Sequence, residues 1–306
     1  MYDVIIIGSG SAGYTAAVYS CRAGRKTMLV AGSIPGGQLM LTSDVENFPG
    51  FPESILGPEL MERMRKQAER FGPEIIYDDA SKVNFKSKPF EVTIGKRTVE
   101  GKTVIISTGA NARWLGIPSE TKFRGHGVSS CATCDGYFFK EKDVVVVGGG
   151  DTALEEATFL ANITKMVTVV HRRDKLRASQ IMQDRSLKNP KIKFVWDSVV
   201  QEILGDNNVS GVRSRNVKTG KEQLLKTNGV FVAIGYEPNT SIFRGEVDLD
   251  SKGYIVTHNE TETNVPGVFA AGDVRDFRYR QAVTAAADGC KAAIDADRFL
   301  SEHYKN

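Results

Sequence analysis

Residues 4–13 read VIIIGSGSAG, in which four β-branched or branched apolar positions are followed by three glycines within six positions. Such apolar residues favour a buried strand, and glycines allow the chain to turn tightly at its end. The next stretch, Tyr14 to Ala23, carries apolar residues at helical spacing. The sequence therefore predicts a strand, a glycine turn and a helix, an order that presents free N–H groups and a positive dipole end to a pyrophosphate.

The same order returns in the middle of the chain. Residues 144–153 read VVVVGGGDTA and continue into a helix-forming run that ends at Ala161, with Gly148 placed 140 positions after Gly8. One glycine turn is weak evidence of a nucleotide site. Two such turns, each between a strand and a helix, predict two dinucleotides bound by two related domains.

Later strands echo one another and indicate how the domains are connected. TVIISTG at residues 103–109 and GVFVAIG at residues 229–235 each end an apolar strand at a glycine, and VPGVFAAGD at residues 265–273 closes on Gly-Asp. We interpret the chain as an α/β protein of two Rossmann-like dinucleotide-binding domains, the second inserted into the first. The expected boundaries are residues 1–113 and 243–306 for the first domain and residues 114–242 for the inserted one.

Composition narrows the class of protein. The 306 residues carry 40 basic and 37 acidic side chains, and their net charge of +3 argues against a dedicated nucleic-acid binder. Hydrophobic residues make up 41% of the chain, which argues against disorder. The four cysteines are too few for a secreted disulfide framework, the opening strand at Tyr2 leaves no signal peptide, and no apolar run reaches the ~20 residues of a membrane span. We expect a cytoplasmic protein with no membrane or nucleic-acid partner.

The residues after the second strand of the inserted domain indicate its nucleotide. A NAD site has an acidic residue about 20 positions after the glycine turn, where it binds the ribose 2′-hydroxyl. Here the strand at residues 166–170 is followed by His171, Arg172 and Arg173, with Arg177 four positions later. A cationic cluster at this position favours a 2′-phosphate and predicts NADPH rather than NADH. The alternative is a solvated basic surface.

The corresponding stretch of the first domain has neither an acidic residue nor a cationic cluster. Its second strand, residues 26–30, is followed by Ala-Gly-Ser at residues 31–33, so no carboxylate is assigned to an adenosine ribose. Residues 36–38, Gly-Gly-Gln, could surround a cofactor with backbone amides, although a simple turn is the alternative. Asp273 could accept a hydrogen bond from a polyol hydroxyl.

A pair of cysteines precedes the second glycine turn, in CATCD at residues 131–135. This spacing allows a disulfide and supports dithiol exchange. The alternative is structural zinc, which needs four ligands, whereas Cys21 and Cys290 are single and the four histidines are scattered. We expect both single cysteines to be buried and inert. Asp135 could transfer protons as thiolates form, with a turn or helix cap as its alternative role.

In combination these segments resemble the low-molecular-weight thioredoxin reductases over essentially the whole chain. The motifs that carry the resemblance are GSGSAGYTAA at residues 8–17, GGQL at 36–39, VENFPG at 45–50, CATCDGYFF at 131–139, GGGDTALEEA at 148–157, HRRDKLR at 171–177, FAAGDV at 269–274 and YRQA at 279–282.

The resemblance implies an NADPH-dependent thioredoxin-disulfide reductase, a homodimer with FAD in the split domain and NADPH in the inserted one. It implies a redox-active disulfide between Cys131 and Cys134, with Asp135 beside it and Cys134 nearer the flavin. The implied FAD contacts are Ser9, Gly10, Ala12, Gly13, Gly36, Gly37, Gln38, Asn47, Gly272, Asp273, Arg280, Gln281 and Ala282. The implied NADPH contacts are Gly149, Gly150, Asp151, Thr152, His171, Arg172, Arg173 and Arg177.

The order of the motifs suggests a mechanism. The cysteine pair and the NADPH turn both belong to the inserted domain, yet both must exchange electrons with one flavin in the other domain. We hypothesise that the inserted domain rotates on its two linkers between half-reactions, so that electrons pass from NADPH to FAD, to the disulfide and to thioredoxin.

Three other functions share parts of this pattern. The flavoprotein disulfide reductase of a peroxide-detoxifying system usually carries an additional N-terminal redox module, whereas the first strand here starts at Tyr2. A flavin-dependent NADPH oxidase or a ferredoxin reductase would be favoured by loss of the cysteine pair. A nucleotide-binding scaffold with a structural metal is the alternative outside enzymology.

Overall fold

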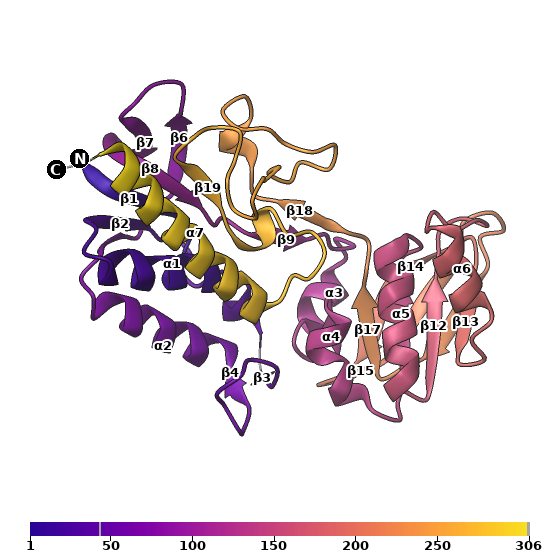
Figure 1. Cartoon of the computed structure of the whole chain (residues 1–306). Helices are drawn as coiled ribbons and strands as arrows, with labels where there is room; N and C mark the ends of the chain where they lie inside the picture. The colour runs from indigo at the N-terminus through magenta and orange to yellow at the C-terminus, as the bar shows by residue number, and fades with distance from the viewer. Residues whose placement is uncertain (43, 305–306) are drawn as a thin grey trace. The chain divides into compact units, whose positions relative to one another are not determined.

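A computed structural model of the chain describes residues 1–42 and 44–304 and separates into two compact units (Figure 1). The split unit comprises Met1–Asn111 and Glu237–Asn306, and the inserted unit comprises Ala112–Tyr236. Both units have the α/β, Rossmann-like architecture predicted from the sequence. Within the described ranges, no helix is long and apolar enough to cross a membrane.

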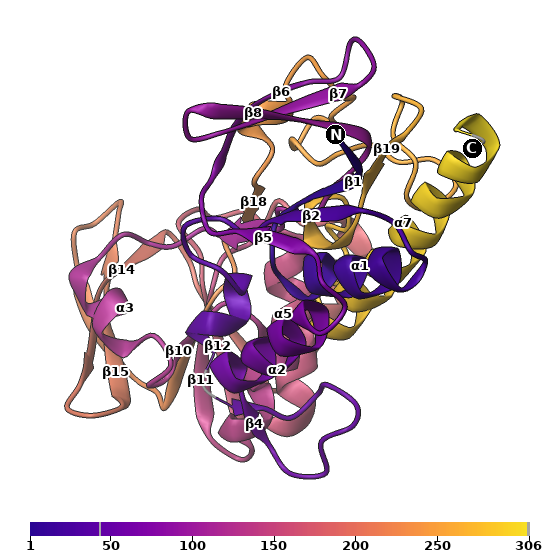
Figure 2. The ribbon, with the colours of Figure 1, turned by 90° about the vertical axis from the view of Figure 1, so that its left-hand side faces the viewer.

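The split unit is built on a seven-stranded sheet in the order β5-β2-β1-β8-β7-β6, with β19 paired to β8. β5, β2, β1, β19 and the second half of β8 run parallel, and the first half of β8 forms an antiparallel meander with β7 and β6 (Figure 2). The bounds are β1 (Tyr2–Ile7), β2 (Thr27–Val30), β5 (Glu74–Ile76), β6 (Ala80–Asn84), β7 (Phe90–Ile94), β8 (Arg97–Ile106) and β19 (Val268–Ala270), with a separate hairpin of β3 (Asp44–Val45) and β4 (Ile55–Leu56).

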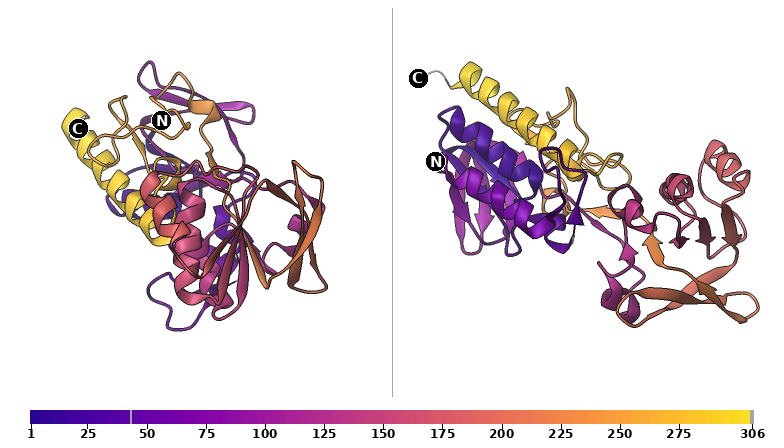
Figure 3. Two further views of the ribbon diagram at one scale, coloured as in Figure 1. Left: turned by 90° about the vertical axis from the view of Figure 1, so that its right-hand side faces the viewer. Right: turned by 90° about the horizontal axis from the view of Figure 1, so that it is seen from below.

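Helices cover one face of this sheet (Figure 3). They are α1 (Ser11–Arg22), α2 (Gly57–Glu69) and α7 (Ala282–His303), and three 3₁₀ turns, η1 (Gly37–Leu41), η3 (Ser241–Phe243) and η4 (Gly272–Val274), lie in the connections. α1 and α7 pack so closely that a Cβ on Gly289 would lie 2.1 Å from the carbonyl oxygen of Ala12. The other face packs on apolar side chains of β6, β7 and the segment at residues 243–255. Because both faces are covered, residues 4–7 of β1 are all buried.

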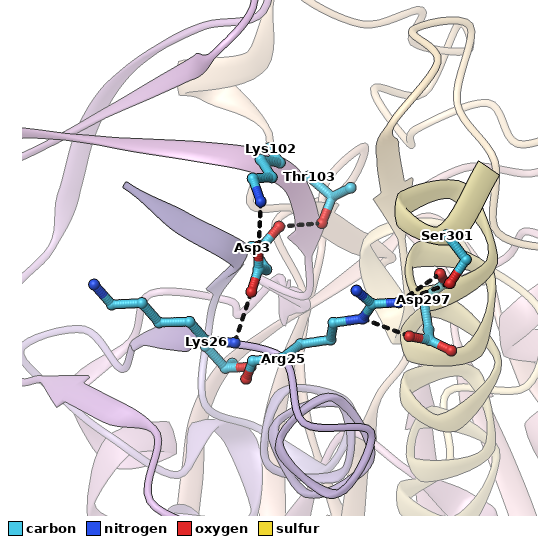
Figure 4. Close-up of polar contacts among 8 residues, drawn as sticks. Asp3, Arg25, Lys26, Lys102, Thr103, Asp297 and Ser301 are labelled. Atoms are coloured by element: carbon cyan, nitrogen blue, oxygen red, sulfur yellow. Dashed lines mark hydrogen bonds and ion pairs between the residues drawn. The ribbon is translucent and has the colours of Figure 1, made fainter. Parts of the chain in front are cut away.

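Polar contacts fix the amino ends of the parallel strands (Figure 4). The carboxylate of Asp3 accepts hydrogen bonds from Lys102 Nζ at 2.8 Å and from the backbone N–H of Lys26 at 3.0 Å. Arg25 donates to Asp297 of α7 at 2.6 Å. These bonds join β1, β8, the start of β2 and α7 at the end of the sheet opposite the glycine turn, which leaves the carboxyl ends of the strands free to form a site.

The inserted unit repeats this plan with a five-stranded parallel sheet in the order β10-β17-β11-β12-β13. One face packs on α5, and the other packs on the antiparallel sheet β14-β15-β16. The strand bounds are β10 (Val128–Ser129), β11 (Asp143–Val147), β12 (Met166–Val170), β13 (Ile192–Val195), β14 (Ser198–Gly205), β15 (Val209–Asn216), β16 (Glu222–Lys226) and β17 (Gly229–Val232). The helix bounds are α3 (Pro118–Phe123), α4 (Ala132–Asp135), η2 (Gly136–Phe139), α5 (Asp151–Ile163) and α6 (Gln180–Leu187).

The two chain crossings pair with each other instead of forming two separate loops. β9 (Ala110–Ala112) and β18 (Tyr236–Pro238) make a two-stranded sheet. The backbone N–H of Arg113 donates to the carbonyl of Gly235 at 2.9 Å on one side of it. The chain therefore leaves and re-enters the split unit through adjacent, hydrogen-bonded segments.

Candidate functional site

The first glycine turn has two packed glycines and one open one. A Cβ on Gly8 would lie 2.3 Å from the carbonyl oxygen of Ser107, and a Cβ on Gly13 would lie 1.9 Å from the carbonyl oxygen of Gly8. A Cβ on Gly10 would meet no atom within 4 Å. The outer glycines are thus required for the strand and helix to pack, and Gly10 is where a ligand could approach the backbone.

The amino end of α1 fits an anion at this turn. Its N-cap, Gly10, has no capping side chain, and its first turn holds no acidic residue. The first N–H groups of a helix have no partner within the helix and carry the positive end of its dipole. Open backbone and positive potential together suit a pyrophosphate.

Neighbouring loops are tied to this turn by one buried hydroxyl. Ser9 Oγ donates to the carbonyl of Ala31 at 2.6 Å and accepts from the N–H of Gly36 at 3.0 Å. A Cβ on Gly37 would lie 3.4 Å from Gly10 Cα. The end of β2 and the Gly-Gly segment therefore border the open side of the turn.

Gln38 lies at the edge of the split unit, where its side-chain amide donates to Asn111 Oδ1 at 2.8 Å. Asn47 donates to Gln281 Oε1 at 3.2 Å, so two residues assigned to the flavin from distant segments are in contact. Arg280, beside Gln281, has a left-handed backbone with φ of 51° that residues with a side chain seldom adopt. Ala282 is the first residue of α7.

The Gly-Asp pair after β19 approaches the same helix. A Cβ on Gly272 would lie 3.1 Å from the Cβ of Ala12 in α1. Burial raises the pKa of the neighbouring Asp273 to about 7, and the nearby carboxylates of Asp276 and Asp288 act in the same direction. This carboxyl is placed to exchange hydrogen bonds with a polar group at the start of α1 and α7.

The second glycine turn reproduces the first. A Cβ on Gly148 would lie 2.4 Å from the carbonyl oxygen of Ala233 and 2.7 Å from the Cβ of Ala153, whereas a Cβ on Gly150 would meet no atom within 4 Å. Gly150 is the N-cap of α5 and has no capping side chain. The open backbone position is therefore the third residue of the turn in both units, Gly10 and Gly150, the position that approaches the pyrophosphate in dinucleotide sites.

His171 lies beneath this turn. Only 4% of the residue is exposed, and a Cβ on Gly149 would lie 2.3 Å from the imidazole ring. Its Nε2 lies 3.0 Å from the carbonyl oxygen of Lys175. Burial lowers the pKa of His171, and Arg177 and Arg172 lower it further, so the ring is neutral at neutral pH and supports the turn from below.

The loop that follows β12 carries three arginines with exposed side chains. Arg172, Arg173 and Arg177 are exposed, and in the part of the chain that the structure describes none is hydrogen-bonded or ion-paired to a carboxylate. Asp174, the acid among them, is bound by Lys218 Nζ at 2.8 Å, which lowers the pKa of Asp174. The loop thus presents uncompensated positive charge, which suits a phosphate.

The arginine loop is held against the turn at two points. The N–H of Arg177 donates to the carbonyl of Gly149 at 2.8 Å. Asp151 Oδ1, in the first turn of α5, accepts from the N–H of Ser179 at 2.8 Å and from its hydroxyl at 2.7 Å. Asp151 therefore positions the loop, and Thr152 follows it half-buried at the helix start.

The cysteine pair forms a disulfide, as the spacing allowed, with an S–S distance of 2.08 Å. Cys131 is the N-cap of α4, and its N–H donates to Ser129 Oγ at 3.0 Å. Burial raises the pKa of Asp135, and a hydrogen bond with Ser129 opposes this shift. The site thus combines a half-buried disulfide with a carboxyl that keeps its proton to higher pH than usual.

The remaining cysteines depart from expectation. Cys21, in the last turn of α1, and Cys290, within α7, are free thiols, but both are half-buried rather than fully buried. Burial still raises the pKa of the Cys21 thiol. No group of three or more His, Cys, Asp or Glu side chains is arranged for a metal ion among residues 1–42 and 44–304.

Some residues that shape the site were not predicted from the sequence. The hydroxyl of Ser107 donates to the carbonyls of Ile7 and Gly8 at 3.0 and 3.1 Å and so braces the first turn. Ser107 lies in the TVIISTG strand, a motif from which its place at the site could have been predicted. No sequence motif marks Ser179, because its partner in α5 is 28 positions away.

Comparison with known proteins identifies relatives over the full length. Residues 2–289 match the pyridine nucleotide-disulphide oxidoreductase family. The chain is 55% identical to a thioredoxin reductase of Streptomyces coelicolor, over 98% of this chain and 94% of the relative. It is also 55% identical to a thioredoxin reductase of Rickettsia bellii, over 98% of each. The crystal structure of thioredoxin reductase from Streptococcus pyogenes superposes with a TM-score of 0.94 at 45% identity and 99% coverage of both chains.

The half-buried Asp273, whose pKa is raised, should make stability depend on pH in the ligand-free protein. Its pKa is about 7 in the folded chain against 3.8 unfolded. Between these pH values the native state binds more protons than the unfolded state does. The free energy of unfolding therefore falls as pH rises from about 4 to about 7. Asp273→Asn should remove this loss and unfold at higher urea than the parent protein at pH 8, with little difference at pH 4.

Asp276→Asn is the matched control, because it removes a nearby carboxylate and should have the smaller effect. A difference between Asp273→Asn and the parent protein that is the same at both pH values would contradict the assignment.

Proposed function

The chain belongs to the pyridine nucleotide-disulphide oxidoreductase family and is a thioredoxin-disulfide reductase. We propose that it uses FAD in the split unit and NADPH in the inserted unit. Membership of the family implies a flavin and a nicotinamide cofactor. The observation that carries the proposal is the Cys131–Cys134 disulfide in the same unit as a glycine turn to which a loop with three exposed arginines is hydrogen-bonded.

The split unit fits the flavin nucleotide. The open face of Gly10 would receive the pyrophosphate, and the segment at residues 36–38 would close over it with backbone amides. Asp273 would accept from or donate to a hydroxyl of the cofactor, because its pKa near 7 allows either. Bound there, the flavin supplies a two-electron carrier between nicotinamide and disulfide.

The inserted unit fits NADPH. Gly150 would receive the pyrophosphate at the start of α5. Arg172, Arg173 and Arg177 would bind the 2′-phosphate, since their charge is not neutralised by an acid of the loop. His171 and Asp151 would act through the protein, the first by supporting the turn and the second by holding the arginine loop.

The cysteine pair carries the exchange with thioredoxin. Reduction of the disulfide by two electrons and two protons breaks the S–S bond and gives two thiols. One, as thiolate, attacks a sulfur of the thioredoxin disulfide and forms a mixed disulfide. The other thiol, as thiolate, then attacks the mixed disulfide and displaces the thioredoxin sulfur. This step restores the Cys131–Cys134 disulfide and leaves thioredoxin as a dithiol that takes up the two protons. Asp135 would hold a proton beside Cys134 during these steps.

We propose a homodimer on the strength of the family resemblance. The cysteine content, with two free thiols beside the one disulfide, supports a reducing compartment such as the cytoplasm.

We also propose that the inserted unit rotates between half-reactions. The disulfide and the NADPH turn belong to the inserted unit, whereas the flavin turn belongs to the split unit. The units are joined by two crossings, β9 and β18, which pair with each other and form one connection. A paired connection can serve as a hinge.

A covalent link between the two units should therefore abolish turnover and leave the binding of each cofactor unchanged. A photocleavable bifunctional linker provides the control, because illumination should restore NADPH-dependent thioredoxin reduction. Full activity in the linked protein would rule out the rotation.

The arginine loop should determine coenzyme choice. Charge-assisted hydrogen bonds contribute about 1.5–3 kcal/mol each, so the combined change of Arg172, Arg173 and Arg177 to alanine should raise KM for NADPH at least about 100-fold. KM for NADH should change little. Arg185→Ala, an exposed arginine on α6, is the charge-matched control. An equal loss with both coenzymes would contradict the assignment.

The function itself is tested by reduction of oxidised thioredoxin with NADPH. The purified protein should turn over with NADPH and poorly with NADH. Cys134→Ser should abolish thioredoxin reduction because one thiol cannot complete the exchange, and it should retain its flavin. Cys290→Ser, which changes a free thiol, should remain active. NADPH consumption without thioredoxin reduction would indicate an oxidase or another partner.

A further inference from the structure

The split unit lacks the carboxylate that a Rossmann site places after its second strand. In such sites an acidic residue there binds the ribose of the adenosine half. β2 ends at Val30, and the following residues, Ala31, Gly32 and Ser33, carry no charge. The adenosine ribose of a dinucleotide therefore needs an acceptor from elsewhere in the unit.

A neighbouring strand delivers a carboxylate to this place. β5 runs parallel to β2 at the edge of the sheet, with Val30 opposite Ile76 (Figure 2). The pairing extends beyond the strands, because the N–H of Ala31 donates to the carbonyl of Ile76 at 2.8 Å. Both chains thus leave the sheet at its carboxyl edge together, and Asp79 follows β5 by three residues.

Asp79 is held at the end of β2 by Ser33. The N–H of Ser33 donates to Asp79 Oδ1 at 3.0 Å, and its hydroxyl donates to Oδ2 at 2.7 Å. A Cβ on Gly32 would lie 3.2 Å from Oδ1, and Gly32 has φ of 83°. Glycine is therefore the residue that lets the two loops approach this closely.

The carboxylate remains available to a ligand. The bonds from Ser33 hold the pKa of Asp79 below its usual range, so it is ionised at neutral pH. Asp79 is exposed, and none of the cationic side chains that the structure describes forms an ion pair with it. An ionised carboxylate has about four acceptor positions, of which Ser33 uses two. The cis hydroxyls of a ribose supply the two donors that match the rest.

We propose that Asp79, oriented by Ser33, is the ribose-binding carboxylate of the split unit and replaces the acid absent from the end of β2. The ligand group is the 2′,3′-diol of the adenosine half of a dinucleotide. The assignment rests on the proposed function, in which that dinucleotide is FAD.

The test compares FAD with an analogue whose adenosine ribose is 2′,3′-dideoxy. Each is titrated into flavin-stripped protein, and Kd is read from quenching of flavin fluorescence. The parent protein should bind FAD about 10–100-fold more tightly than the analogue, from hydrogen bonds to a charged acceptor. Asp79→Asn should weaken FAD binding by a similar factor and bind the two ligands with nearly equal affinity.

Glu53→Gln, the same charge change at an exposed position of the split unit, should keep the preference of the parent protein. If Asp79→Asn also keeps it, or weakens both ligands equally, Asp79 is not the ribose acceptor. A parent protein that binds no FAD would overturn the proposed function and this inference together, whereas retained FAD binding with an unchanged preference overturns the inference alone.

Discussion

The structure depends on one constraint, the near contact of a strand, a helix and a neighbouring strand at each glycine turn. At Gly8 and Gly148 the missing side chain leaves room for the carbonyl of the adjacent strand, at 2.3 and 2.4 Å from where a Cβ would lie. The small residues Gly13 and Ala153 allow α1 and α5 to pack closely against their glycine turns. This close packing aims each helix axis at the carboxyl edge of its sheet, where Gly10 and Gly150 leave the backbone open.

Given two copies of this turn, the loop after the second strand differentiates the units. In both, a serine of that loop donates its N–H and its hydroxyl to an aspartate, Ser33 to Asp79 and Ser179 to Asp151. In the inserted unit, the loop held by this contact carries arginines that no acidic side chain of the described residues neutralises. In the split unit, the exposed charge is that of Asp79, the aspartate that accepts from the serine. The same serine–aspartate contact thus accompanies positive charge at the carboxyl edge of the sheet in the inserted unit and negative charge in the split unit. This difference in charge favours different ligands in the two units.

The sequence was informative where chemistry is encoded by short spacing and less so where it depends on distant pairing. The glycine turns and the Cys131–Cys134 disulfide each lie within six residues. α1 begins at Ser11, earlier than the expected Tyr14, because the turn residue Gly10 is itself the N-cap. The pairing of β9 with β18 and the contact of Ser33 with Asp79 join segments far apart in the chain, and no local pattern marks them.

Three aspartates show how the same side chain is adapted by its surroundings. Two donors from Ser33 at an exposed edge keep Asp79 ionised, so that both of its oxygens act only as acceptors. Burial raises the pKa of Asp135 beside the disulfide and of Asp273 beside the start of α1, which favours the protonated form. A carboxyl that keeps its proton to higher pH than usual can donate as well as accept, and next to a thiol pair it can return a proton that thiolate chemistry removes. The placement of each aspartate on an exposed edge or at a half-buried position therefore sets which role it can perform, before any ligand binds.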